Sequence, residues 1–529
     1  MRRLWSALLL ACLVVGTGHA VRAEDASPLS ALAAPSLDEL RRGVEALGRS
    51  GDPRALPVIA ALNEGALYVR SDRALFIRTP SGFVDAATGA PAPDVTASRL
   101  KKVRVNNPVR EAINDALGAL RLFAPDPAAR AAAADAVFHD HDPHALAALD
   151  RALAKETDPG ARRAMTDARA AALLFTPDAS TQDRLDAVAR LRARGGMEAR
   201  GLLEQVSGQP PAVAAAAASA ITAIDGSLWL WGLAQSAYYG ISLGSVLLLA
   251  AAGLAITFGV MGVINMAHGE MVMLGAYTTF MVQGLVLGLA PALSGVSLLV
   301  AIPAAFIVSG GLGVVIERTL IRWLYGRPLE TLLATFGLSL ILQQAVRSIF
   351  GANNRAVSTP GWMSGEAHLG GLAVTYNRLA IIVFAFLVTA GLAAVMRFTP
   401  LGLRMRAVTQ NRLMASAMGI RTPRVDALTF GLGSGIAGMA GVALSQIDNV
   451  SPNLGQGYII DSFMVVVFGG VGNLWGTVVG ALVLGVVNKF LEPIAGAVLG
   501  KIAVLVLLIL FIQRKPRGLF PIRGRAVEA

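Results

Sequence analysis

Long apolar stretches follow one another from residue 226 onward, whereas the chain before them alternates apolar and polar positions at helical spacing. A helix needs about 20 apolar residues to cross a bilayer. The pattern therefore predicts a polytopic helical membrane domain over 226–529, with about 8–10 spans, some of them broken. The predicted spans are 228–250, 251–264 continuing brokenly into 266–289, 296–317, 331–350, 379–396, 425–447, 461–490 and 496–513.

Two sequences are predicted to break these helices. Residues 264–270 can start a new helix, with Asn265 as its cap and Glu270 near its positive dipole end. Residues 469–476 contain four glycines around Asn473. If 448–458 faces outside, a single crossing through 461–490 would leave the basic C-terminal end outside as well. We therefore expect the chain to turn back at 469–476, with a long kinked helix as the alternative.

Charge sets the expected orientation of the spans, because cytoplasmic loops are enriched in lysine and arginine. Residues 226–529 hold 19 basic and 9 acidic residues, whereas residues 1–225 hold 27 and 26. The positive excess thus belongs to the apolar half, which argues against nucleic-acid binding. Fourteen basic residues form three clusters that we place in the cytoplasm: Arg318, Arg322 and Arg327; Arg397, Arg404, Arg406, Arg412, Arg421 and Arg424; and Arg514, Lys515, Arg517, Arg523 and Arg525.

The N-terminal half is predicted to be a separate domain. Residues 1–23 have a basic start, a short apolar run containing Cys12 and small residues for cleavage, as in a signal peptide. Residues 24–225 then form an extracytoplasmic domain. Its amphipathic helices end in tight turns, at 51–57, 141–146 and 195–200, from which second helices start. This pattern resembles an α-solenoid of HEAT-like repeats.

Two features of this domain depart from a regular helical repeat. Short aromatic and β-branched runs near 66–90 predict a small β insertion, a hairpin or a three-stranded meander, in a chain that is otherwise all-α. His139, His141 and His144 lie beside two aspartates, and imidazole is a common metal ligand. A solvated turn between helices explains these histidines, so we predict no metal site and no catalytic residue.

Four separated sequence blocks resemble one known family. Residues 253–270 (GLAITFGVMGVINMAHGE) resemble the signature stretch of permeases of the branched-chain amino-acid ABC uptake family. Residues 327–339, 468–473 and 517–520 are similar to further blocks of that family. The resemblance covers roughly 230–522, and Met266 stands where the family commonly has phenylalanine.

The resemblance implies that the chain is the permease subunit of an ABC importer. Such a subunit crosses the bacterial inner membrane several times and contacts membrane lipid. By resemblance, cytoplasmic ATP-binding subunits use the ATP, a second related permease completes the pore, and a periplasmic solute-binding protein delivers the solute. The permease itself would be neither an enzyme nor a cofactor protein; none of its six lysines lies in a phosphate-binding G-x-x-x-x-G-K-[ST] sequence. The added N-terminal domain resembles urea-type permeases, so urea is the expected solute, with branched-chain or other amino acids as the alternative.

Residues 403–420 form a short amphipathic helical pattern that looks like the coupling loop on which an ATPase subunit docks. Small residues there permit close seating, and arginines can reach acidic groups of a partner. A solvated loop helix is the alternative. The residues chosen from this loop are Arg404, Arg406, Asn411, Ala415 and Gly419.

Polar residues inside the apolar spans are the candidate pathway residues, because polar groups at membrane depth are costly unless they serve a function. Broken-helix ends can point at a transported solute. For the individual Ser, Thr and Gln residues, hydrogen bonding between helices is the alternative. The candidates are Asn265, His268, Glu270, Thr335, Gln343 and Asn473, with Ser339 and Gln344 beside them.

Two other functional classes fit parts of the pattern. An ion-driven secondary transporter would need buried carboxylates as coupling sites, and Glu270 is the main intramembrane one. A membrane-anchored scaffold would use the repeat domain as its working part.

Overall fold

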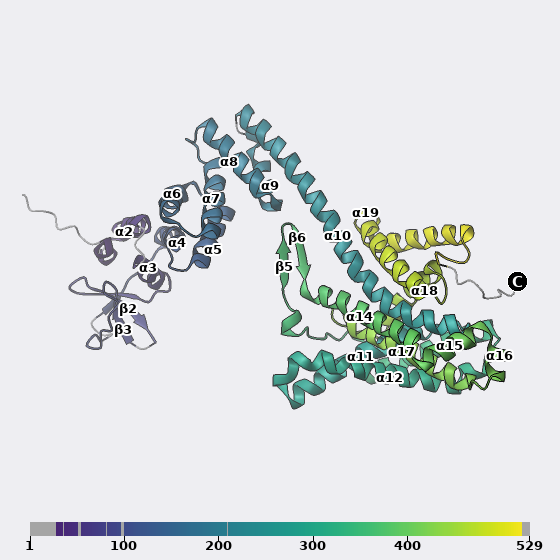
Figure 1. Cartoon of the computed structure of the whole chain (residues 1–529). Helices are drawn as coiled ribbons and strands as arrows, with labels where there is room; N and C mark the ends of the chain where they lie inside the picture. Colours follow the sequence, from purple (N-terminus) through teal and green to yellow (C-terminus); the bar gives the residue numbers. More distant parts are fainter. Residues whose placement is uncertain are drawn as a thin grey trace, which may run out of the picture. The chain divides into compact units, whose positions relative to one another are not determined.

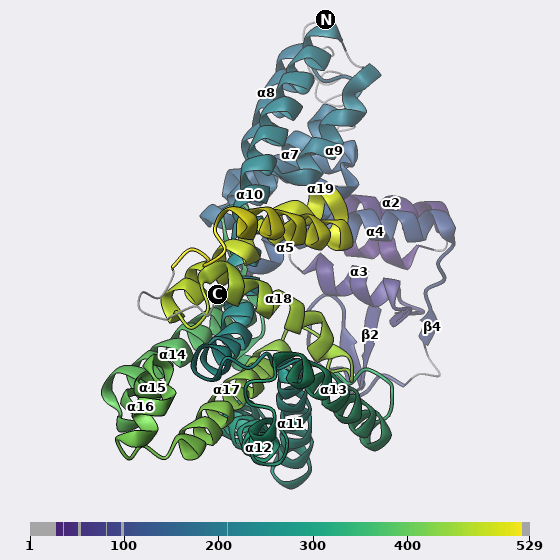
Figure 2. The ribbon, with the colours of Figure 1, turned by 90° about the vertical axis from the view of Figure 1, so that its right-hand side faces the viewer.

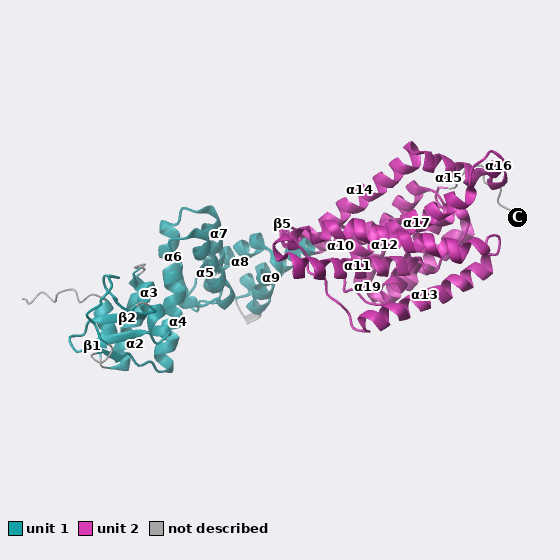
Figure 3. Ribbon diagram, turned by 90° about the horizontal axis from the view of Figure 1, so that it is seen from below, with its two compact units in different colours: residues 1–228 teal, residues 229–529 magenta. Residues whose placement is uncertain are grey.

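Helices form most of the two units into which the chain divides, residues 1–228 (unit 1) and 229–529 (unit 2), as Figure 3 shows. The structure is a computed structural model that describes residues 28–34, 36–50, 54–80, 82–96, 100–208 and 210–520. The predicted signal peptide with Cys12, the turn residues 51–53 and the arginines Arg523 and Arg525 lie outside the described residues.

Unit 1 contains short helices and one small sheet. The helices and 3-10 turns are η1 (Pro28–Ala33), α2 (Leu37–Ser50), α3 (Ala55–Asn63), α4 (Asn107–Arg121), α5 (Pro127–Asp140), η3 (Pro143–Ala145), α6 (Leu146–Lys155), α7 (Pro159–Leu174), α8 (Thr181–Arg194), α9 (Gly196–Glu204) and η4 (Gln205–Gly208). Helix α10 (Pro211–Met261) contains the boundary between the units. Whether this helical array is of the HEAT type stays a prediction.

Asp-Pro pairs fix where several of these helices begin. Asp126 accepts hydrogen bonds from the first backbone N–H groups of α5, and Asp158 does the same for α7. Asp142 accepts from the His144 N–H at 2.9 Å. The proline that follows each aspartate has no N–H to leave unsatisfied and already holds a helical φ.

The β insertion is larger than predicted. Strands β1 (Leu67–Arg70), β2 (Leu75–Thr79) and β3 (Gly82–Asp85) form the expected meander. A fourth strand, β4 (Leu100–Lys102), pairs with β1 and gives the antiparallel order β3-β2-β1-β4. Two of the three β4 residues are lysines, so its sequence has no apolar alternation that would predict a strand.

A buried ion pair joins the helices of unit 1. The Glu156 side chain is 2% exposed, and its two oxygens accept from Nε and Nη2 of Arg130 at 2.6 and 2.8 Å. Glu156 also accepts from the backbone N–H groups of Thr157 and Asp158, both at 2.9 Å. The Arg130 guanidinium in particular holds the pKa of Glu156 at about 2, below its usual 4.5. The pair ties α5 to the start of α7.

Unit 2 contains the long apolar helices. Its elements are α11 (His268–Leu289), η5 (Pro291–Val296), α12 (Ser297–Thr319), η6 (Ile321–Trp323), α13 (Pro328–Phe350), η7 (Gly361–Met363), β5 (Glu366–Leu369), β6 (Leu372–Thr375), α14 (Tyr376–Phe398), α15 (Pro400–Gln410), α16 (Arg412–Ala417), α17 (Thr422–Leu444), α18 (Leu454–Gly469) and α19 (Leu474–Arg514). Among the described residues, seven helical segments are long and apolar enough to cross a membrane, and α18 is a shorter apolar helix.

Helix α17 lies at the centre of this unit, against α11 and α12 (Figure 1), and almost all of its residues are buried. Glycines let the backbones approach closely. A Cβ at Gly433 would lie 2.6 Å from the Gly253 carbonyl oxygen of α10, and one at Gly310 of α12 would lie 2.9 Å from the Gly431 carbonyl oxygen. In lipid, the burial of apolar surface gives helices little driving force to associate. They associate by close packing, which small residues at the contacts allow.

Two expectations about the apolar segments are wrong in detail. The predicted spans 228–250 and 251–264 are one helix, α10, because a continuous apolar run carries no signal for a boundary there. The number of spans, about 8–10, stays a prediction: the described residues contain seven long apolar helices and the shorter α18, and α19 joins two helical segments at Gly496. The region 351–378 contains an unpredicted hairpin, β5–β6, with Gly370 at φ +65° in its turn. The hairpin is held by Gln235 of α10, which exchanges two hydrogen bonds with the Ala373 backbone.

The chain turns back where the four glycines predicted it, between α18 and α19 (Figure 2). A Cβ at Gly480 of α19 would lie 3.0 Å from the Val465 carbonyl oxygen of α18, so α19 returns along α18. Helix α19 is itself kinked at Gly496, where φ is +77°. After α19, the backbone N–H groups of Leu519 and Phe520 donate to the carbonyls of Phe468 and Gly469. The C-terminal segment therefore ends beside the turn.

The Glu156 pair predicts a pH-dependent unit 1. Because the folded pKa of Glu156 is depressed, its stabilising contribution is complete above about pH 4.5 and is lost as the pH falls toward 2. Replacing Arg130→Met leaves a buried charge unpaired and should lower local stability by about 3 kcal/mol at pH 7. Hydrogen exchange of α5 and α7 peptides in the full chain measures this loss.

Arg169→Met is the matched control, because Arg169 pairs with Asp150 on the surface, where both side chains are exposed. Exposed pairs of this kind contribute less than about 1 kcal/mol. Equal exchange in the two variants, or protection of α5 that does not change between pH 5 and pH 3, would contradict the role given to Glu156.

Candidate functional site

The first helix break separates α10 from α11 and is built by residues 262–267. Gly262 turns the chain at φ +68°. Asn265, 2% exposed, accepts from the Ala267 N–H at 3.0 Å through its side-chain oxygen. The prediction that Asn265 caps the helix is therefore wrong: the N-cap residue of α11 is Ala267, which makes no side-chain cap, and Asn265 stabilises the turn just before the helix. Thr335 of α13 accepts from the Met266 N–H at 3.2 Å and so holds the break from the other side.

Glu270 is the third residue of α11 and is 1% exposed. Its Oε1 accepts hydrogen bonds from the Ser339 hydroxyl at 2.8 Å and from the Gln343 side-chain amide at 2.7 Å. Both partners come from α13. The structure thus brings Glu270, Gln343 and Ser339 together, as a network of buried polar side chains between two apolar helices.

Four polar side chains of α13 lie on one buried face. Thr331, Thr335, Ser339 and Gln343 are spaced four apart and are buried. The opposite face exposes large apolar residues such as Leu333 and Ile341. This is the reverse of a helix in a water-soluble domain. Residues four apart stack on one side of a helix, so the spacing alone aligns these groups toward α11.

Gln456, on α18, extends the network and was not predicted. Its amide nitrogen donates to the Gln343 side-chain oxygen at 3.3 Å. Helix α18 reaches this position because Gly455 and Gly269 pack backbone against backbone. The sequence signal was weak, since Gln456 falls in the stretch 448–458 that was expected to face outside.

Two buried polar atoms at the start of α11 have no hydrogen-bond partner among the described residues: Oε2 of Glu270 and Nδ1 of His268. The other ring nitrogen of His268 contacts the Ala250 carbonyl at 2.9 Å. Leaving a buried polar atom unpaired costs about 1–3 kcal/mol. Such atoms are available to a water molecule or to a polar solute.

A small apolar cavity of about 210 Å³ lies beside the first break. Its walls come from the end of α10, the break itself, α13 and α18, and Asn265 is its single polar side chain. The lining residues are Leu254, Phe258, Ile264, Asn265, Met266, Leu332, Ile459, Ile460 and Phe463. The accessible wall is almost entirely apolar, so the arrangement suits a compact aliphatic group.

Asn473 is not brought to the Glu270 network. Its side-chain oxygen caps α19 by accepting from the N–H groups of Trp475 and Gly476, and its amide donates to the Phe520 carbonyl at 3.2 Å. The second break (residues 470–473) does approach α10, because a Cβ at Gly259 would lie 2.6 Å from the Gly472 Cα. Gln344 is exposed on α13 and takes no part in the network.

The predicted coupling loop forms two short helices, α15 and α16. Asn411 caps α16 by accepting from the Met414 N–H at 2.9 Å, and Arg406 donates to the Met396 carbonyl at 2.7 Å. Ala415 is buried, whereas Arg404 and Gly419 are exposed. The residues missed by the sequence reasoning are apolar: Leu413 and Met418 are 85% and 78% exposed.

An ion pair fixes α16 to the central helix α17. Arg412, the first residue of α16, pairs with Asp426, whose side chain is fully buried. The guanidinium also lies over the Tyr325 ring, 4.5 Å from its centroid. Glu317 of α12, a second buried carboxylate, has one oxygen without a hydrogen-bond partner among the described residues. Arg412 therefore offsets the buried charge of Asp426, and Arg318 forms an ion pair with the same Glu317 oxygen at 3.6 Å.

The described part of the chain contains no group of three or more His, Cys, Asp or Glu side chains arranged to hold a metal ion. In unit 1 the His139 ring bonds to Asp135 and Glu198, and the His141 ring stacks on Phe175. The His139 and His141 rings thus have separate partners.

Known relatives match unit 2. The high-affinity branched-chain amino acid transport system permease proteins BraD of Pseudomonas aeruginosa and LivH of Salmonella typhimurium are 32% and 31% identical. Each match covers 54% of this chain and 94% of the relative. The ribose import permease protein RbsC of Bacillus subtilis is 32% identical over a shorter stretch, 18% of this chain and 31% of the relative.

No solved structure matches the chain significantly. Residues 236–513 match the family model described as branched-chain amino acid transport system / permease component. That range contains both helix breaks, the Glu270 network and the α15–α16 pair, and more than half of the chain. With its seven apolar helices, the chain is a multi-pass membrane protein that belongs to the family of branched-chain amino acid transport system permease components.

Proposed function

We propose that this chain is the membrane-spanning permease subunit of an ABC importer in the bacterial inner membrane. Its family and its apolar helices support this assignment. In the proposed assembly, ATP-binding subunits dock on the cytoplasmic side, a second related permease completes the pore, and a periplasmic binding protein delivers the solute. Unit 1 would lie on the extracytoplasmic side, after the signal peptide expected over 1–23.

The observation that carries the proposal is the polar network around Glu270, which is buried among apolar helices at a helix break. Its groups come from α11, α13 and α18, so a shift of α13 or α18 would open or close it. Alternating access needs such a rearrangement between two states. We place the solute pathway beside this network and the neighbouring apolar cavity.

The α15–α16 pair is the proposed docking site for an ATP-binding subunit. The exposed Leu413 and Met418 give it an apolar contact surface. The Arg412–Asp426 pair joins that surface to α17, which packs against α11 and α12. A movement imposed on α16 would therefore be passed to the helices that hold the candidate pathway.

Branched-chain amino acids are the solute class with the most support. The relatives BraD and LivH carry that substrate in their names, and the cavity beside Asn265 is lined by aliphatic and aromatic side chains. An aliphatic side chain fits this lining, and Glu270 could attract the ammonium group of the amino acid.

Urea is the second candidate. The family match begins at residue 236, so unit 1 lies outside it. A permease with an added N-terminal domain resembles the urea-type systems, and the side chains of Glu270, Ser339 and Gln343 offer the acceptors and donors that a small amide needs.

Uptake by cells separates the two candidates. Cells that lack this chain and are complemented with it are given labelled leucine or labelled urea. We expect restored leucine uptake that unlabelled leucine abolishes and excess urea does not. The reverse result, urea uptake indifferent to leucine, would assign urea. Failure to restore either, with the chain present in the membrane, would contradict an import function for these solutes.

Glu270→Gln should lower the uptake rate about tenfold at normal expression. The amide keeps the size of the carboxylate but loses its charge and one acceptor oxygen, and a hydrogen bond to a charged group contributes about 1.5–3 kcal/mol. Glu330→Gln is the control, because Glu330 is an exposed carboxylate in the first turn of α13 and takes no part in the Glu270 network. Wild-type uptake by both Glu270→Gln and Asn473→Ala would remove the two breaks from the pathway.

Arg412→Met should separate ATP hydrolysis from uptake. In the assembled complex we expect uptake to fall at least tenfold while ATP hydrolysis continues, because α16 no longer holds α17 through Asp426. Arg424→Met, an exposed arginine two residues from Asp426, is the control. If the double variant Arg412→Met/Asp426→Leu recovers full uptake, the pair has a structural role and does not transmit movement.

A further inference from the structure

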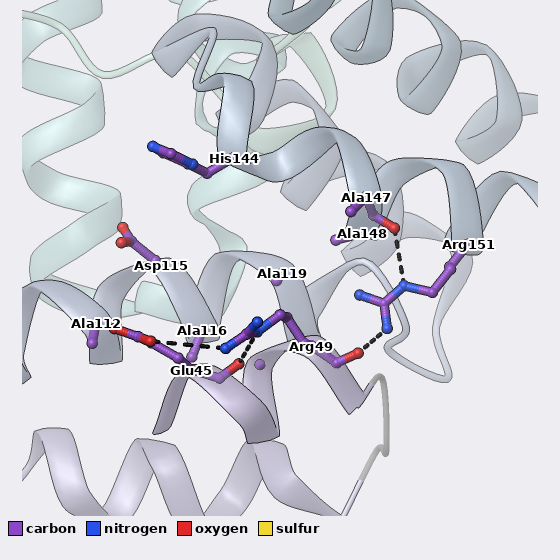
Figure 4. Close-up of a pocket in the computed structure, with 11 residues that line it drawn as sticks. Glu45, Arg49, Ala112, Asp115, Ala116, Ala119, His144, Ala147, Ala148 and Arg151 are labelled. Atoms are coloured by element: carbon purple, nitrogen blue, oxygen red, sulfur yellow. Dashed lines mark hydrogen bonds and ion pairs between the residues drawn. The ribbon is translucent and has the colours of Figure 1, made fainter. Parts of the chain in front are cut away.

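A cavity of about 430 Å³ opens in unit 1 between α2, α4 and the η3–α6 segment (Figure 4). Its base consists of small residues, Gly48, Ala112, Ala116, Ala119 and Ala148, which leave the space empty. The helices cannot close it, because α2 already touches α4: a Cβ at Gly48 would lie 2.8 Å from the Ala116 Cβ. The volume is in the range of small-molecule sites.

Charged side chains of both signs line this cavity. Glu45 and Arg49 come from α2, Asp115 from α4 and Arg151 from α6. Arg151 donates to the Ala147 carbonyl at 2.9 Å and also to the Arg49 carbonyl, which fixes its guanidinium at the rim. Figure 4 shows these dashed contacts, and it also shows the Arg49 guanidinium reaching toward Glu45, with Asp115 on the far side from Arg151. Arg49 donates to the Glu45 carbonyl at 3.2 Å and lies 3.8 Å from the Glu45 carboxylate, so these two charges offset each other, whereas Asp115 and Arg151 lie apart.

Asp115 is the carboxylate left open for a ligand. None of the described residues forms a hydrogen bond with its side chain, and the His144 ring faces the same space from the opposite wall (Figure 4). Partial burial raises the pKa of Asp115, and the nearby Asp142 and Glu111 carboxylates add to the effect. The potential at this end of the cavity is therefore negative and favours a cationic group.

We propose that this cavity binds a small zwitterionic α-amino acid with an aliphatic side chain. The ammonium group would lie at Asp115, the carboxylate at the free N–H groups of Arg49 and Arg151, and the side chain on the alanine base. Arginine is well suited to carboxylates because its N–H groups form a planar fork. The site lies in unit 1 and is independent of the solute pathway proposed for unit 2.

The chemistry excludes other ligand classes. A nucleotide or another polyanion would be repelled by Glu45 and Asp115. A purely apolar ligand would leave the charged rim desolvated and unpaired, which is costly. Urea has no charge to match either end, so the zwitterion gains more from this cavity than urea does.

Equilibrium binding of labelled leucine to the detergent-purified full chain tests the proposal. Asp115→Asn and Arg151→Gln should each weaken binding at least tenfold. Glu39→Gln is the matched control, because Glu39 is an exposed carboxylate in the first turn of α2 and lies outside the cavity lining. Glu270→Gln alters the proposed pathway in unit 2 and should leave this binding unchanged. Thermal unfolding of each variant shows that the fold is retained.

The outcomes separate this site from the transport function. Binding that Asp115→Asn weakens and Glu270→Gln does not supports the proposal, whichever solute the cells take up. Binding unchanged in Asp115→Asn, or removed by Glu270→Gln alone, would overturn it. So would displacement of leucine by urea at similar concentrations, because that would show a site for a neutral amide. An absence of leucine binding to a folded chain would overturn it as well.

Discussion

Close backbone contact around α17 is the constraint on which unit 2 depends. In an apolar surrounding, helices gain little from hiding apolar side chains and must associate by packing. The glycines of α17 and the facing glycines of α10, α11 and α12 allow this packing, and there is no room for a side chain at Gly433 or Gly310. With four helices fixed in this way, the start of α11 is held in one place. Glu270 and His268 are buried there, and the position of α11 determines which groups they can reach.

The polar network follows from that constraint. Once α11 is fixed, the hydrogen-bond partners of Glu270 must come from the helices beside it. Ser339 and Gln343 of α13 donate to Glu270, and Gln456 of α18 donates to Gln343. One carboxylate oxygen still lacks a hydrogen-bond partner among the described residues. The closely packed part of the bundle thus ends at a polar site: Gly455 holds α18 against Gly269 of α11, whereas α13 makes few contacts with α11 besides its polar side chains. A transport protein needs this division between a fixed frame and parts that can move.

The sequence predicted the features that arise from local chemistry. Both helix breaks lie where glycine and asparagine interrupt apolar runs, and Glu270, Thr335 and Gln343 were candidates because they are polar residues inside apolar spans. Contacts between distant residues were not predictable. Arg130 and Glu156 are 26 positions apart and carry no joint signal, although they form a buried pair. The continuity of α10 was missed for the opposite reason, since an unbroken apolar run marks no helix end. Gln456 was missed because it lies where a loop was expected.

The turn between α18 and α19 has a consequence for how the protein enters the membrane. Helix α18 has 16 residues, about 24 Å of helix, which is shorter than the apolar core of a bilayer. As an independent segment it is too short to span that core, so we expect it to insert together with the first half of α19, as one hairpin. The backbone bonds from Leu519 and Phe520 can close over the turn only after the last helix has been made.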